Sequence, residues 1–301
     1  MKIGMIDLGA SPGHIFPNLP LMKLSAWHKR RGDEVEFYEP LSGHYDKVYA
    51  SKVFDFAPDY DYPIYADEVV YGGTGYSLET VLPPEAESVY PDYSLYGVKD
   101  MAYGFLTRGC PRGCGFCVVT EKEGPVSRKV SELSGFWNGQ RNIKLLDPNL
   151  LACNERETLL KQLAGSGAWI DFSQGLDIRL MTEDIAGLIM NCKIKMLHFA
   201  WDSEKDSGIV CRSLELFKRR TGIDMRKARV YVLVNYDTDF EFDLYRVYAL
   251  KSLGYDPYIM IYDKQAADRK YRQLQRWVNN KFIFRSGGAE RFEDYLAGVR
   301  K

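Results

Sequence analysis

Three cysteines lie close together in this 301-residue chain, in the run Cys110-Pro111-Arg112-Gly113-Cys114-Gly115-Phe116-Cys117. The spacing lets one short loop, rich in Gly and Pro, direct three thiolates at one small inorganic group. Thiolates are soft ligands, and in proteins they hold chiefly zinc and iron–sulfur clusters. Structural zinc needs four closed ligands, and no fourth Cys or His lies within short reach of this loop. A 4Fe–4S cluster held by three cysteines keeps one iron without a protein ligand, which is a place for chemistry.

The loop resembles the cluster loop of radical S-adenosylmethionine enzymes, which has the pattern Cys-x3-Cys-x2-Cys with an aromatic residue before the last Cys. Phe116 has that aromatic position, and Thr107-Arg108-Gly109 resembles the lead-in of members with an N-terminal cobalamin-binding-type domain. The resemblance implies a 4Fe–4S cluster on Cys110, Cys114 and Cys117, with S-adenosylmethionine on the open iron. It also implies reductive cleavage of S-adenosylmethionine to a 5′-deoxyadenosyl radical, and a flavodoxin- or ferredoxin-type electron donor as partner.

Two other interpretations of the cysteines remain open. A zinc site could be completed by a distant thiol, from Cys153, Cys192 or Cys211. Alternatively, the chain could be a non-catalytic iron–sulfur protein that senses redox state or transfers electrons. Six cysteines in a chain of this size do not suggest a disulfide framework, which favours a reducing cytoplasm.

Composition gives no case for a membrane or nucleic acid partner. The formal net charge is −1, so no overall field attracts polyanions. The first residues read as a strand and not as a signal peptide, and no apolar run approaches the ~20 residues that a membrane helix needs. We therefore expect a cytoplasmic protein.

Residues 101–265 show a regular alternation of strands and helices. Strand patterns recur about every 30 residues, with helix start and stop signals between them, including Thr182, Asp239 and Gly222. Eight such units close a barrel. Six predict an open, partial (βα)6 TIM-type barrel, which is the fold that the resemblance also implies. Residues 266–301 are expected to form a C-terminal helical extension.

Residues 1–74 are predicted to form a smaller α/β unit, a reduced doubly wound domain with one clear helix at Leu19–Arg31. Residues 75–100, rich in Pro and Tyr, read as an ordered linker. The layout resembles a cobalamin-binding domain, and the turn at 70–75 resembles the one approached by the cobalamin tail. The Asp-x-His-x-x-Gly cobalt-ligand motif is missing, but many members of the family also lack it, so a cobalamin site and a cobalamin-free structural domain both remain open.

Sites in βα folds form where strands end and helices begin, and the cysteine loop follows the first strand of the barrel pattern. Arg179 has the planar fork that suits a carboxylate. The family's Gly-Gly-Glu is absent after the second strand, and Asp202 stands where the family has Glu. By position, the resemblance assigns cofactor contacts to Phe116, Asp147, Pro148, Asn149, Ser173, Gln174, Arg179, Asp202, Ser203 and Asn235.

No catalytic residue or substrate can be identified from a motif. Cys153 precedes a predicted helix start at Asn154, where a thiol would have a lowered pKa and could donate a hydrogen atom. The alternative for Cys153 is a small buried hydrophobe. His198 falls in the middle of a predicted strand, which favours a structural role over that of a base.

Overall fold

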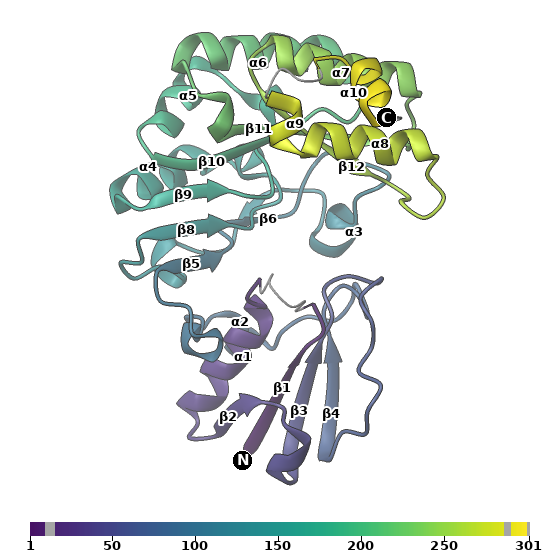
Figure 1. The fold of residues 1–301 in the computed structure, drawn as a ribbon. Coiled ribbons are helices and arrows are strands. Elements are labelled where there is room, and N and C mark those ends of the chain that lie inside the picture. Colours follow the sequence, from purple (N-terminus) through teal and green to yellow (C-terminus); the bar gives the residue numbers. More distant parts are fainter. Residues whose placement is uncertain (10–15, 286–289, 300–301) are drawn as a thin grey trace.

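The computed structural model describes residues 1–9, 16–285 and 290–299, which form two parallel β-sheets (Figure 1). The first sheet has the strand order β2-β1-β3-β4, and the second has the order β12-β11-β10-β9-β8-β5. The predicted mixed α/β class with parallel strands is confirmed. The first sheet comprises β1 (Lys2–Asp7), β2 (Glu34–Phe37), β3 (Tyr45–Ser51) and β4 (Ala66–Gly72). The second comprises β5 (Met101–Gly104), β8 (Asn142–Leu145), β9 (Trp169–Phe172), β10 (Lys193–Ala200), β11 (Ala228–Val234) and β12 (Asp256–Ile261).

The second sheet places strands in the order in which they occur along the chain, with helices α4 to α7 as an outer row over one face (Figure 1). Alternation along β8 shows how one face is buried, since Ile143 and Leu145 are fully enclosed whereas Lys144 between them is not. The carboxyl ends of all six strands meet at one edge, because every pair is parallel. The covering helices are α4 (Arg156–Ser166), α5 (Glu183–Met190), α6 (Ser207–Thr221) and α7 (Phe240–Ser252).

Local signals fix most of these helix ends. Thr182 and Asp239 accept hydrogen bonds from backbone N–H groups at the starts of α5 and α7, and Gly222 ends α6 in the left-handed conformation, all as predicted. The predicted helix start at Asn154 is wrong. Helix α4 begins at Arg156 after Glu155, which makes no capping hydrogen bond through its side chain.

The first sheet is covered by α1 (Leu19–Arg30), whose start is capped by Asn18. The segment that leads to the second sheet contains α2 (Pro84–Glu87) and the 3-10 turn η2 (Tyr93–Tyr96). Tyr93 is buried against the second sheet, where its hydroxyl donates to the carbonyl of Phe136 and accepts from the N–H of Tyr103. This segment is therefore ordered by side-chain contacts.

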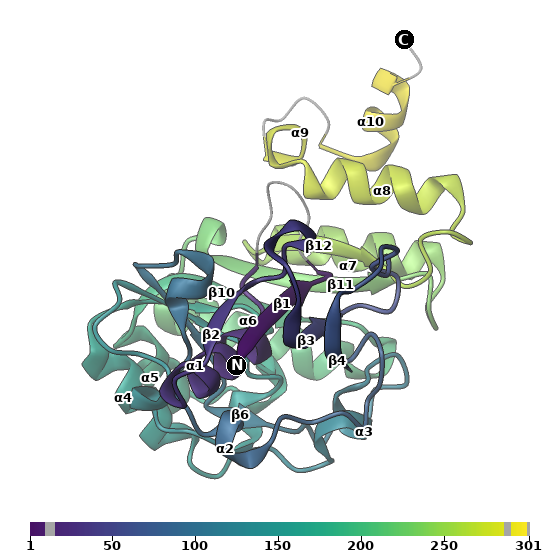
Figure 2. The same ribbon diagram turned by 90° about the horizontal axis from the view of Figure 1, so that it is seen from below.

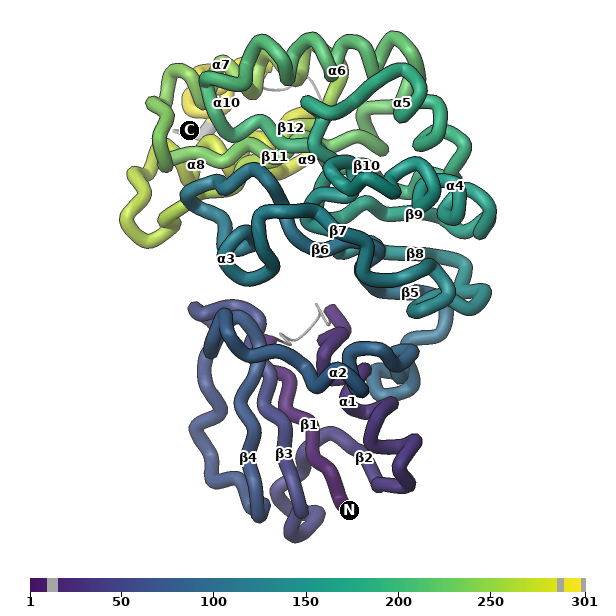
Figure 3. The backbone as a smooth tube through the Cα atoms, turned by 180° about the vertical axis from the view of Figure 1, so that it is seen from behind, coloured from purple at the N-terminus to yellow at the C-terminus, as the bar shows by residue number. Residues whose placement is uncertain are grey.

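Three further pieces position the site. The short pair β6 (Thr107–Arg108) and β7 (Arg128–Lys129) and helix α3 (Val119–Glu123) enclose the cysteine loop, and α3 lies on the side that faces the first sheet (Figures 1 and 3). Helices α8 (Arg269–Asn279), α9 (Lys281–Arg285) and α10 (Phe292–Val299) gather beside β12, away from α4 and α5 (Figure 2). Among the described residues, no helix is long and apolar enough to cross a membrane.

Candidate functional site

The cysteine loop leaves the second sheet at the carboxyl end of β5 and is anchored there by Asp147, which follows β8. The two carboxylate oxygens of Asp147 accept hydrogen bonds from the N–H groups of Leu106 and Thr107 and from the Thr107 hydroxyl. Burial raises the pKa of Asp147 to about 6, although these hydrogen bonds oppose the shift. Asp147 therefore holds the lead-in to the loop, and the predicted cofactor contact at this residue gains no support from its placement.

The two ends of the loop are held together by a contact between Gly109, which precedes Cys110, and helix α3, which follows Cys117. Gly109 has φ +88°, and a Cβ at this position would lie 2.2 Å from the carbonyl oxygen of Val126, so only glycine fits. Glu123 accepts hydrogen bonds from the Gly109 N–H (3.1 Å) and from Arg108 (2.8 Å). The conformation of the loop is thus imposed by groups outside it.

The three loop thiols lie within electrostatic reach of one another, and none forms a disulfide. Burial raises the pKa of Cys114, and negative charge on Cys117, Cys110 and then Asp202 raises it further, whereas Arg179 opposes the shift. Cys117 is exposed, and Cys110 and Cys114 are half-buried. A positive group placed among them would stabilise the thiolates, as a bound iron or zinc ion does.

A cavity of about 150 Å³ lies beside this loop at the carboxyl edge of the second sheet. It brings together four of the residues predicted to contact the cofactor, Phe116, Arg179, Asp202 and Ser203, with the predicted ligand Cys114. These residues come from the loop, from the turn after β9 and from the end of β10. Its lining also includes residues that sequence reasoning missed: Gly115, Ala200, Trp201, Asp206, Val210, Tyr236 and Asp237.

Arg179 is already paired in this structure. Its Nε donates to Asp177 at 2.7 Å, and another guanidinium nitrogen pairs with Asp206. Arg112 in the cysteine loop pairs with the second oxygen of Asp177. Burial would raise the pKa of Asp177, but the hydrogen bond and charge of Arg179, followed by those of Arg112, hold it below its usual value. The loop is therefore linked to the turn after β9 by a charged network.

Asp202 is positioned by the backbone of the neighbouring strand, because its Oδ1 accepts from the N–H of Leu233 at 2.9 Å. Burial raises the pKa of Asp202, against the effect of that hydrogen bond. Beneath it, the fully buried Arg246 of α7 donates to the carbonyl oxygens of Trp201 and Leu233 and pairs with Asp243. This guanidinium ties the ends of β10 and β11 together at the height of the cavity.

The remaining predicted contacts are not among the residues that line the cavity. Asn149 donates from Nδ2 to Cys110 Sγ (3.5 Å) and to Asp177 (3.4 Å), and its buried Oδ1 has no partner among the described residues. Ser173 donates to the carbonyl of Leu145, and Asn235 has φ 62° at the turn after β11. Pro148 and Gln174 lie outside the lining as well. Asn149 is thus the one of this group that contacts a predicted cluster ligand.

The prediction of a lowered pKa at Cys153 is wrong. Cys153 ends the 3-10 turn η4 (Leu150–Ala152), is fully buried, and donates to Glu155 at 3.1 Å. Burial raises its pKa, and the Glu155 carboxylate, which favours the protonated thiol, raises it further. The small, protonated thiol is packed in the core, as the alternative interpretation held.

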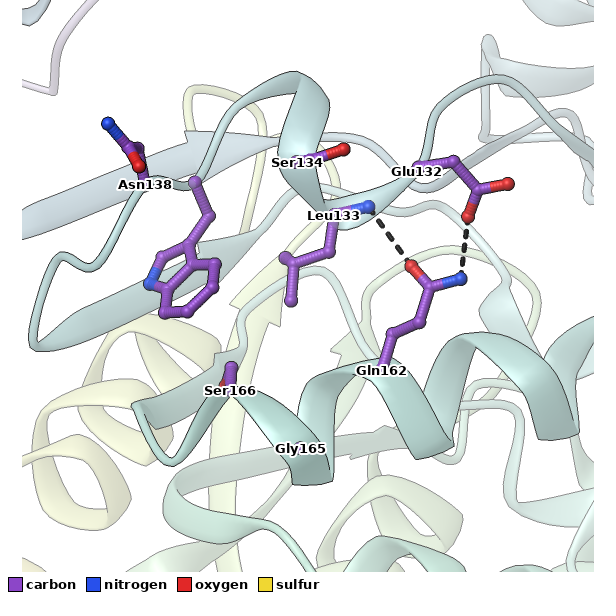
Figure 4. Close-up of a pocket in the computed structure, with 8 residues that line it drawn as sticks. Glu132, Leu133, Ser134, Asn138, Gln162, Gly165 and Ser166 are labelled. Carbon is purple, nitrogen blue, oxygen red and sulfur yellow. Dashed lines mark hydrogen bonds between the residues drawn. The ribbon is translucent and has the colours of Figure 1, made fainter.

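A second, larger hollow of about 520 Å³ lies between the 3-10 turn η3 (Leu133–Gly135) and α4 (Figure 4). Gln162 crosses it, accepting from the N–H of Leu133 and donating to Glu132, and the Trp137 indole donates to Gln140 (Figure 4 shows the Gln162 contacts). Because these polar groups already have partners, the hollow offers little to a ligand.

The turn at 70–75 of the first sheet is packed against its own chain. Gly73 has φ +94°, and a Cβ there would lie 2.3 Å from the carbonyl oxygen of Lys52. The Gly75 N–H donates to that same oxygen at 2.8 Å. The glycines are therefore required by the close approach of residues 52 and 54.

The donor set suits a thiolate-bound cluster better than a single ion. Within the described part of the chain, no three His, Cys, Asp or Glu side chains are arranged to bind one metal ion. Thiolates on a 4Fe–4S cluster each bind a different iron, so they need not converge on a point. The free thiols and the Asn149 amide N–H that donates to Cys110 fit such a group. No protein-family model matches the chain, and no curated protein matches it.

Proposed function

We propose that this protein is a radical S-adenosylmethionine enzyme whose substrate is not assigned, built on the second sheet as a partial (βα)6 barrel. The observation that carries the proposal is the cavity beside the cysteine loop, which gathers Cys114 and Phe116 with Arg179, Asp202 and Ser203. These five residues were selected from motif positions in three segments far apart in sequence. Their position around one cavity supports the proposal, because one bound molecule could contact all five.

Cys110, Cys114 and Cys117 would hold a 4Fe–4S cluster. With S-adenosylmethionine bound, this group would supply one-electron reductive cleavage to a 5′-deoxyadenosyl radical, the electron coming from a flavodoxin- or ferredoxin-type donor. The chain's own residues would position S-adenosylmethionine and shield it from water. Arg179 offers a guanidinium for a carboxylate once Asp206 releases it, and Phe116 packs edge-on against Tyr236 with ring centroids 5.4 Å apart.

A non-catalytic iron–sulfur protein is the second candidate, and two observations favour it. The cavity of about 150 Å³ is smaller than the 300–1,000 Å³ typical of ligand sites. Arg179 is also neutralised by Asp177 and Asp206. An enzyme must therefore open the Arg179–Asp206 contact when the cofactor enters, whereas an electron-transfer protein has no such need.

The test is cleavage of S-adenosylmethionine by the full chain, reconstituted anaerobically with iron and sulfide and reduced with dithionite. We expect 5′-deoxyadenosine from the wild type and none from Cys114→Ser. Cys211→Ala is the matched control, because it removes a thiol on α6 outside the loop, and it should match the wild type. A reducible cluster without 5′-deoxyadenosine would establish the electron-transfer candidate instead.

A further inference from the structure

The second sheet carries charged and polar side chains on the face opposite helices α4 to α7. Lys144, Asp171 and His198, here called the inner-face cluster, lie on the adjacent strands β8, β9 and β10. Asp171 and His198 are less than one-tenth exposed. Buried groups of this kind are costly unless they are paired or used. The residue before each of them belongs to the helix-covered face and is fully buried: Ile143, Ile170 and Leu197.

His198 is held in one tautomer. Its Nδ1 lies 3.0 Å from the carbonyl oxygen of Phe172, and because a carbonyl only accepts, Nδ1 carries the hydrogen. The ring is stacked on Tyr231, with centroids 5.1 Å apart and planes 11° apart. Burial lowers the pKa of His198, although Asp171 and the Phe172 carbonyl oppose the shift, so the ring is neutral at pH 7. Nε2 is then a hydrogen-bond acceptor, and no donor to it lies among the described residues.

Asp171 lies next to the His198 imidazole, and its negative charge is balanced by Lys144. Its Oδ2 lies 3.4 Å from Lys144 Nζ, and its buried Oδ1 has no hydrogen-bond partner among the described residues. The distance from Oδ1 to His198 Nδ1 is 3.7 Å, which is too long for a hydrogen bond. The next cation along the sheet, Arg229 on β11, is engaged by Asp256 at 3.3 Å. The inner-face cluster therefore has no excess charge of either sign.

Aromatic side chains flank the cluster. Tyr103 on β5 and Tyr231 on β11 are both half-buried, and the Tyr231 hydroxyl donates to the carbonyl of Ser173. Phe16, from the segment that enters α1, lies edge-on to Tyr103 at 6.0 Å, and Lys144 Nζ is 4.3 Å from its ring centroid. Phe16 is 56% exposed, so part of its ring is open to a ligand.

The inner-face cluster lies on the same face of β10 as Ala200, which lines the cavity beside the cysteine loop. Residues two apart on a strand share a face, which places His198 and Ala200 on the same face of β10, just before the turn that carries Asp202. Ala200 and Asp202 line the cavity, and His198 lies one step further toward the middle of the sheet, at about 7 Å along β10 from Ala200.

We propose that the inner-face cluster binds the substrate, and that His198 Nε2 accepts a hydrogen bond from a neutral N–H or O–H group on a planar or apolar body, such as a carboxamide. A cationic group would meet Lys144, and an anionic group would meet Asp171 and the lone pair of Nε2. A neutral donor meets neither penalty. Calling this ligand the substrate rests on the proposed function, whereas the binding itself does not.

The test uses the full chain labelled with ¹⁵N-histidine and three probes of similar shape: benzamide, benzoate and benzylammonium. At neutral pH, the Nε2 signal of His198 should show an unprotonated nitrogen that shifts and saturates with benzamide alone. His198→Phe should weaken benzamide binding about tenfold, as expected for one lost hydrogen bond. His44→Asn is the matched control and should leave binding unchanged, since His44 is exposed and pairs with Asp67 in the first sheet.

A second variant covers the case in which His198→Phe does not fold. Asp171→Asn keeps the shape but leaves Lys144 unbalanced, so it should shift the preference toward benzoate. A hydrogen on Nε2 at neutral pH, equal responses to the three probes, or an unchanged preference in Asp171→Asn would overturn the inference. Formation of 5′-deoxyadenosine is scored separately. If 5′-deoxyadenosine is formed but benzamide does not bind, this inference fails and the proposed function stands. If benzamide binds but no 5′-deoxyadenosine is formed, the binding site stands and the proposed function fails.

Discussion

Both sheets of this protein are parallel, yet their carboxyl edges differ in how their polar groups are used. In the first sheet the polar groups pair with other groups of the same chain. The Asn18 amide donates to the Ser51 hydroxyl, and Asp7 accepts hydrogen bonds from the Tyr96 hydroxyl and from a backbone N–H. Lys52 reaches Asp59 at 3.0 Å. Ligands bind at such edges when the groups there are left for them. Among the residues that the structure describes, the carboxyl edge of the first sheet leaves few polar groups unpaired.

The second edge keeps groups without partners. Its loop has three free thiols, Asn149 Oδ1 is buried and unpaired, and the indole nitrogen of Trp201 in the cavity lining has no hydrogen-bond partner in the part of the chain described. Buried polar groups are usually satisfied, so these two unpaired side-chain atoms at the second edge are available to a ligand. The comparison shows that sheet topology alone does not locate a binding site. Side-chain groups without hydrogen-bond partners at the carboxyl ends of the strands are the better guide.

The sharpest way to break the comparison is to remove the group that holds the second edge together. Arg246→Leu would leave Asp243 buried without its partner and would free two strand-end carbonyls. We expect the free energy of unfolding to fall by about 4 kcal/mol, measured by urea denaturation. Arg226→Leu removes an exposed Arg–Asp pair of similar spacing and should leave stability nearly unchanged. Similar losses in both variants would contradict the assigned role of Arg246.

A pH titration of stability tests whether Asp147 is as buried as the loop anchor requires. Its folded pKa of about 6 lies above the ordinary value of 3.8, so the folded state binds this proton more tightly than the unfolded state. The contribution of Asp147 is therefore most favourable below pH 4 and is lost as pH rises through 6, by about 3 kcal/mol. Asp147→Asn should remove that part of the slope between pH 4 and pH 7. An unchanged slope would show that Asp147 is solvated.

The glycine turn of the first sheet offers a smaller effect with a matched control. Gly73 and Gly43 have nearly equal φ values, +94° and +93°, but only Gly73 meets backbone within 4 Å. Gly43→Ala should cost about 1 kcal/mol for the left-handed backbone alone. Gly73→Ala should cost about 2 kcal/mol more because residue 52 must move. Equal losses of unfolding free energy in the two variants, measured by thermal or urea denaturation, would show that residue 52 does not restrict Gly73 and that the turn is open to a ligand.

Much of the fold could be predicted from periodicity and local signals. The six strands of the second sheet lie within residues 101–265, where the alternation was predicted, and Thr182, Asp239 and Gly222 mark helix ends as expected, because these signals act within one turn. The start of α4 could not be predicted, since Asn154 matches the capping pattern but the chain makes a 3-10 turn there instead. Boundaries of this kind depend on tertiary contacts.

The candidate site was predictable in outline and not in its pairings. Motif positions selected Cys114, Arg179 and Asp202, which line one cavity in the structure. They could not show that Asp147 turns toward the backbone, because an Asp after a strand can face either the ligand or the chain. The pairing of Arg179 with Asp177 had a weak signal in the sequence, because Asp177 lies two residues before Arg179 on the same turn. Asp206 had none, because only folding brings it there.

The most direct test of the central claim, that the second edge holds an open cluster on three thiols, is electron paramagnetic resonance of the reduced, reconstituted full chain. We expect the signal of one reduced 4Fe–4S cluster per chain, which changes shape when S-adenosylmethionine is added, and its loss in Cys114→Ser but not in Cys153→Ala. A cluster signal indifferent to S-adenosylmethionine, or one that persists in Cys114→Ser, would contradict the account.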